Sequence, residues 1–258
     1  MERRLIGDRV EFDNPWVELT ALPAAVLFTS LFAWSPVGRV LLVPFQIQFH
    51  ELGHAMMAWL SSRAALPLPF GFTFWTEEPS RFTGACMLFL IGVLFVRSLR
   101  EHRRFAVLFA CGLLLAFVIL SGFVSVERSR MFLLFAGLAG ELVLTSLVMI
   151  AFYFPFPDRM RWDFLRFVAL LPAAGSWVSA VSMWRGVARG ARTLPMGSLL
   201  GDGTGDLDRL MYEYAFSQGE IISFYGKLAL STVVLVVMTY AVFALRAGRK
   251  LGFVPAWD

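Results

Sequence analysis

Long apolar runs, separated by short clusters of charged residues, are the feature that most restricts how this chain can fold. They cover residues 16–34, 40–60, 83–96, 105–124, 131–154, 164–184 and 228–245. Most of them approach the roughly 20 residues that an α-helix needs to cross the ~30 Å hydrocarbon layer of a bilayer. We therefore expect an all-α polytopic membrane protein with six or seven transmembrane helices.

Composition supports this expectation. The chain has 258 residues, of which 58% are hydrophobic and 16% are charged, whereas soluble domains have about 25% charged residues. The net charge of +4 lies in the segments between the apolar runs, which is typical of arginines flanking a membrane. Nucleic acid is thus not an expected partner. With no repeat and no flexible linker, residues 1–258 are expected to form one membrane-embedded domain.

A non-helical segment, LPLPFGFTFWTEEPSR, follows the second apolar run at residues 66–81. Pro67 and Pro69 end any helix that continues into it. Three phenylalanines then alternate with other residues, with the period of two that indicates a β-strand. They are Phe70, Phe72 and Phe74. A short strand is therefore expected over residues 70–76.

A second non-helical segment covers residues 192–216, and its centre reads GDGTGD. Glycine and aspartate in this density are typical of turns. An apolar stripe with helical spacing follows, and its members are Leu207, Leu210, Met211 and Tyr214. This spacing predicts a short amphipathic helix directly after the turns.

Ionisable residues interrupt the second apolar run, which contains QIQFHELGHAMMAWL. Two of the three histidines of the chain, His50 and His54, are four residues apart, and Glu51 stands between them. Such groups are costly inside a membrane unless something compensates. On a helix the two histidines share a face and can bind one metal ion, with the glutamate in reach of a metal-bound water. The alternative is a polar patch at a helix interface or on a proton path.

Two histidines leave a catalytic zinc site one protein ligand short, since such sites usually have three protein ligands and a water. The candidates for the third ligand are Glu141, Asp202, Asp206 and Asp208. Glu141 lies inside an apolar run, where it could instead be a buried carboxyl that is hydrogen-bonded to another helix. The aspartates lie in or next to the glycine-rich turns, where each could also be a cap or turn residue. Asp206 stands near the start of the predicted short helix, where a carboxylate is favoured.

The stretch FHELGHAMMA resembles the metal-binding helix of the site-2 protease family of intramembrane metalloproteases. TGDLDRLMYEY is similar to the second element of that family, an aspartate at the start of a later helix, and this similarity puts Asp206 in the ligand position. Asp202, which is followed by a glycine, keeps the family's Asp-Gly pair, but the residues before it differ from the asparagine and proline that usually precede this pair in the family. The chain has no PDZ-like insert, which many members carry.

The resemblance implies a small bacterial member of the family without that insert, a multi-pass protein of the inner membrane. It implies one Zn²⁺ per chain, held by His50, His54 and Asp206, with Glu51 as general base. Membrane proteins or peptides would be the substrates. In the family a re-entrant β region beside the metal presents an open edge to the substrate. The corresponding residues here are Phe70, Phe72, Thr73 and Phe74, although these aromatic residues could instead form an interfacial belt.

Two other functions fit part of the pattern. A CAAX-prenyl-protease-like enzyme would take a glutamate as third ligand, but Glu141 is followed four residues later by Thr145 and not by the aspartate of that family. A metal-binding transporter or non-catalytic membrane partner would not need a glutamate directly after the first histidine, and its ligands would be spread over several helices. Glu51 therefore favours hydrolysis.

Overall fold

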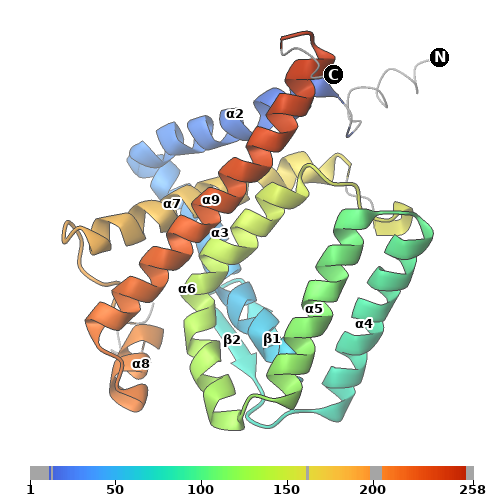
Figure 1. The fold of residues 1–258 in the computed structure, drawn as a ribbon. Helices are drawn as coiled ribbons and strands as arrows, with labels where there is room; N and C mark the ends of the chain where they lie inside the picture. Colours follow the sequence, from blue (N-terminus) through green and yellow to red (C-terminus); the bar gives the residue numbers. More distant parts are fainter. Residues whose placement is uncertain (1–11, 13, 161–162, 198–204, 254–258) are drawn as a thin grey trace.

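The computed structural model describes residue 12 and residues 14–160, 163–197 and 205–253. The chain is mostly helical, with one small sheet (Figure 1). Its helices are α2 (Pro15–Trp34), α3 (Pro36–Leu60), α4 (Arg81–Arg100), α5 (Arg104–Gly122), α6 (Val126–Ala151), α7 (Leu165–Ala188), α8 (Asp206–Tyr214) and α9 (Gln218–Lys250). The strands are β1 (Ala65–Leu68) and β2 (Phe72–Trp75), and a 3₁₀ turn covers Asp158–Met160.

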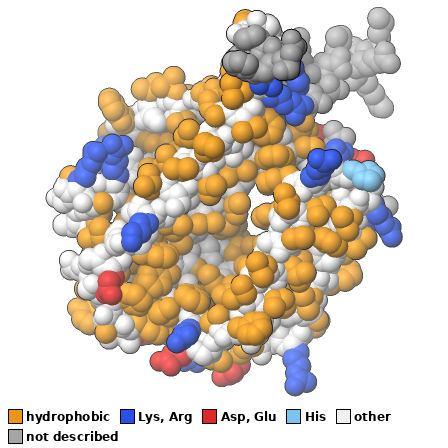
Figure 2. Space-filling model, viewed as in Figure 1, with side chains coloured by type: hydrophobic (Ala, Val, Ile, Leu, Met, Phe, Trp, Pro, Cys, Tyr) orange, Lys and Arg blue, Asp and Glu red, His pale blue; other side chains and the backbone are white. Residues whose placement is uncertain are grey.

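Each predicted apolar run lies largely within one helix. Six helices of the described chain, namely α2, α4, α5, α6, α7 and α9, are long and apolar enough to cross a membrane. Figure 2 shows a face of the molecule that is covered largely by hydrophobic side chains. The other apolar run forms α3, which is continuous but carries glutamines, histidines and a glutamate and is not among the six.

Helix ends follow local capping chemistry. The Asn14 side chain accepts hydrogen bonds from the first turn of α2, and Ser35 caps α3 in the same way. Both helices place a proline directly after the cap, where its missing N–H costs nothing. Pro23 lies inside the first apolar run, and α2 continues through it. Prolines are tolerated inside membrane-type helices because neighbouring groups can satisfy the freed carbonyl.

Helix α3 has its most extensive contact with α6, and its second half, which carries the histidines, is more buried than its first half. Of the six candidate spans, α6 is the most buried, while α4 and α5 are the least buried. Glycines allow the close approach of α3 and α6. A Cβ added to Gly140 would lie 2.6 Å from the Cα of Gly53. Small residues at helix crossings have this role in membrane proteins, and here they bring the HExxH segment against α6.

The two strands form an antiparallel hairpin in which Ala65 pairs with Trp75 and Pro67 with Thr73. The predicted strand is correct for Phe72–Trp75, but Phe70 lies in the turn that precedes it, where Gly71 has a φ of 89°. That positive φ ends the alternation, since it favours glycine and a turn. Strand β1 was not predicted, because ALPL contains a proline and no β-branched residue.

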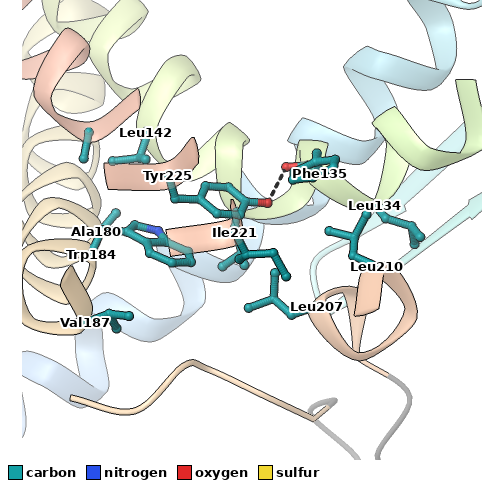
Figure 3. Packing of buried hydrophobic residues seen from close by; sticks show 12 residues of the cluster. Leu134, Phe135, Leu142, Ala180, Trp184, Val187, Leu207, Leu210, Ile221 and Tyr225 are labelled. Carbon is teal, nitrogen blue, oxygen red and sulfur yellow. Dashed lines mark hydrogen bonds between the residues drawn. The ribbon is translucent and has the colours of Figure 1, made fainter. Parts of the chain in front are cut away.

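The short helix predicted after the glycine-rich turns is α8, and its apolar face is buried in a cluster with α6, α7 and α9 (Figure 3). Leu207 and Leu210 are almost completely buried there. In the same cluster the Tyr225 hydroxyl donates to the Phe135 carbonyl at 2.9 Å, and the Trp184 ring stacks on that of Tyr225. This packing fixes the start of α8, and therefore Asp206, in space.

Candidate metal centre

Three side chains that were predicted from the sequence converge at one point. His50 and His54 extend from successive turns of α3, and Asp206 extends from the first residue of α8. The Nε2 atoms of the histidines are 3.2 Å apart, and Asp206 Oδ2 lies 3.2 Å from His50 Nε2 and 3.1 Å from His54 Nε2. His54 is buried, while His50 and Asp206 are partly buried.

This arrangement fits a tetrahedral zinc ion. Ligand atoms at the usual zinc–nitrogen and zinc–oxygen distances lie about 3.3 Å apart in a tetrahedron, and the three separations observed here are 3.1–3.2 Å. Gly137 of α6 provides the space next to them. A Cβ at this position would lie 2.4 Å from His54 Nε2 and 2.5 Å from His50 Nε2, so that any other residue would press on the ligand atoms themselves.

The other ring nitrogens of the two histidines are also engaged. His50 Nδ1 lies 3.1 Å from Glu141 Oε1, and His54 Nδ1 lies 2.7 Å from the Leu133 carbonyl oxygen. Donation from Nδ1 to these acceptors leaves the Nε2 lone pairs available to a metal, which is the usual arrangement around histidine ligands. Glu141, a sequence candidate for the third ligand, thus lies on the far side of the His50 ring from the converging atoms.

The remaining aspartate candidates lie elsewhere. The Asp208 carboxylate accepts a hydrogen bond of 2.7 Å from the Gly197 N–H and so is engaged away from the converging atoms. Asp202 lies outside the described residues. Burial alone would raise the pKa of Asp206, but the charges and hydrogen bonds of His54 and His50 hold this pKa well below its usual range. In a metal-bound form the ligands would be neutral imidazoles and an ionised carboxylate, and the positive ion would take the place of the histidine charges.

Glu51, the residue after His50, is buried, and strand β2 contacts it directly. The Thr73 hydroxyl donates to Glu51 Oε2 at 2.6 Å. Two residues further along the same strand, the Trp75 ring stacks on His54 with 5.6 Å between centroids. Thr73 and Trp75 share one face of β2, because side chains alternate along a strand. Phe72 and Phe74 are on the opposite face and are exposed.

Sequence reasoning identified the histidines, Asp206 and Thr73 but missed two contributors. Trp75 stood in the predicted strand, and period-two alternation places it on the face of Thr73 and opposite the phenylalanines. Gly137 belongs to AGLAG, a segment before Glu141 in which all residues except the leucine are small. Such a run predicts a close helix crossing, but only the packing of α6 on α3 shows that it opens onto the histidines.

Comparison of the chain with protein-family models, with curated proteins and with solved structures found no match in any of the three.

Proposed function

We propose that this protein is an intramembrane zinc endopeptidase, similar to the site-2 protease family. The observation that carries the proposal is the convergence of three ligand atoms within 4.8 Å of one another, with a buried glutamate next to them. The histidines and the glutamate come from an HExxH helix, the arrangement in which zinc peptidases combine a metal with a general base.

A membrane location is part of the proposal. Six helices have the length and composition of membrane spans, and α3 packs against several of them. The hairpin that follows α3 would then be a re-entrant element, since irregular backbone at membrane depth is tolerated where protein covers it or where it lines a wet cavity. Substrates would be membrane-spanning or membrane-proximal segments.

His50, His54 and Asp206 would hold the zinc ion. When bound, zinc would supply Lewis-acid activation of the scissile carbonyl and of the attacking water. Glu51 would accept the proton of that water and deliver it to the leaving amine. Its Oε2 is engaged by Thr73. Among the described residues no hydrogen bond reaches its other oxygen, Oε1, so that Oε1 is the atom for proton transfer.

The substrate would pair with the outer edge of β2. The Thr76 N–H donates to the Ala64 carbonyl, and hydrogen-bonded and non-hydrogen-bonded pairs alternate along an antiparallel ladder. The Pro67–Thr73 pair is therefore non-hydrogen-bonded, which directs the N–H and C=O of Thr73 away from β1. An extended peptide can pair with such an edge whatever its sequence, which suits a protease that acts on unwound membrane segments.

The replacement Glu51→Gln tests this function. It keeps the shape of the side chain but removes the base, so cleavage should fall at least about 100-fold while zinc content stays at about one ion per chain. Cleavage of a quenched fluorescent transmembrane peptide in micelles and metal analysis of the same preparation measure the two effects.

Glu78→Gln, an exposed glutamate in the loop after β2, is the matched control and should cleave like the wild type. Undiminished cleavage by a metal-loaded Glu51→Gln protein would contradict the proposal. Zinc binding without any cleavage by the wild type would favour a non-proteolytic metal-binding protein.

A further inference from the structure

Thr73 belongs to the strand edge and to the catalytic cluster at the same time. Its backbone N–H and C=O lie on the outer edge of β2, as the register of the hairpin requires. Its side chain points to α3, where the hydroxyl is 2.6 Å from Glu51 Oε2 and 3.0 Å from the main-chain oxygen of the same residue. One residue thus connects the proposed substrate edge with the proposed base.

We propose that Thr73 is a positioning residue that couples occupation of the β2 edge to the orientation of the Glu51 carboxylate. This inference rests on the proposed peptidase function and deepens it. A glutamate side chain has several rotatable bonds, and a base that is misplaced by about 1 Å can lose about 100-fold in rate. The hydroxyl of Thr73 restrains one carboxylate oxygen and so orients the other.

The restraint depends on where the strand lies. Threonine is β-branched and has few χ1 rotamers, so that the position of its hydroxyl follows the backbone of β2 closely. Trp75 gives β2 a second contact with α3, by stacking on His54. A peptide that pairs with the outer edge would order the backbone of Thr73 and, through the same residue, the carboxylate. The Glu51 carboxylate would thereby be held in place best when a substrate peptide is bound.

Two variants separate the hydroxyl from the bulk of the side chain. Thr73→Val keeps the branched shape and the backbone donor but removes the hydroxyl, and Thr73→Ser keeps the hydroxyl. For Thr73→Val we expect kcat to fall between about tenfold and about 100-fold, with KM within about twofold of the wild type because the strand edge is intact. Thr73→Ser should recover most of kcat, and zinc content should be unchanged in both.

The assay uses the full zinc-loaded chain in micelles and the quenched transmembrane peptide, with Glu51→Gln as background. Wild-type kcat in Thr73→Val, or an equal defect in Thr73→Ser, would overturn the role of the hydroxyl. A raised KM with unchanged kcat would also overturn it, because Thr73 would then contribute to binding alone. If the wild type cleaves no faster than Glu51→Gln, the peptidase function fails, and this inference fails with it.

Discussion

Two clusters of buried ionisable groups are satisfied in different ways. Near the C-terminal end of α9, the buried Glu18 of α2 has the basic groups Arg246 Nε and Lys250 Nζ each at 3.8 Å. In the metal centre, a carboxylate and two imidazole nitrogens approach one another more closely, at 3.1–3.2 Å. The three members of that centre are two histidines and one aspartate.

The difference separates an acid with a structural role, Glu18, from the acid that we propose as a metal ligand, Asp206. A buried carboxylate is tolerated when cations compensate its charge, and α9 supplies two cations to Glu18. Asp206 instead faces the Nε2 atoms of two histidines whose Nδ1 atoms are already engaged. Nitrogen and oxygen atoms that direct lone pairs at one another repel, and a positive ion between them would remove this repulsion. The charge of Glu18 is therefore compensated from within the chain, whereas the proposed metal centre would be completed by a metal ion.

The largest effect on zinc affinity is expected when the carboxylate of Asp206 is replaced by an amide. The same replacement at Glu18, in the ion-pair cluster, is the comparison. Asp206→Asn removes a charged ligand, so zinc affinity should fall more than about 100-fold, beyond the loss expected for an outer contact. Glu18→Gln should leave zinc affinity unchanged and cost about 1 kcal/mol of stability or less, since its cations are partly solvated. Competition with a chromogenic chelator and thermal unfolding in micelles measure these quantities. Equal loss of zinc affinity in both variants would contradict the proposal that Asp206, but not Glu18, is a metal ligand.

A methyl group placed against the ligand atoms should have the next largest effect. Gly137→Ala introduces a Cβ that overlaps both Nε2 positions, so zinc affinity should drop at least about tenfold as the histidines are pushed aside. Gly92→Ala in α4 is the matched control, because nothing lies within 4 Å of its added Cβ and alanine favours a helix by about 1 kcal/mol. Wild-type zinc affinity in Gly137→Ala would show that the ion is not held where these atoms converge.

Loss of the Glu141 contact should have the smallest effect on the metal. Glu141→Gln keeps an oxygen near His50 Nδ1 but removes the charge, so zinc affinity should fall by no more than about 10-fold, the lower end of the range for such outer contacts. With Co²⁺ in place of zinc, the visible absorption bands should shift while their tetrahedral intensity persists. Complete metal loss would instead make Glu141 a direct ligand, as in the CAAX-protease hypothesis.

Much of the fold was predictable because membrane-type helices are specified locally. Asn14 and Pro15 start α2, and the apolar stripe of Leu207 and Leu210 predicts α8. The β-hairpin was only half predictable. The alternation over Phe72–Trp75 is local, but β1 exists because β2 pairs with it, and ALPL has no strand signal of its own.

The sequence by itself determined the two-histidine half of the site and the place of Glu51, because residues four apart on a helix share a face wherever the helix lies. Tertiary structure decided the rest, because the residues alone left Glu141 and three aspartates open as third ligand and only the resemblance selected Asp206. Asp206 is 156 residues from His50 in the chain, and only the packing of α8 in its apolar cluster brings its carboxylate to the histidines while Glu141 meets His50 from the other side. Contacts between residues so far apart in the sequence depend on how whole helices pack, and no local periodicity of the sequence predicts that packing.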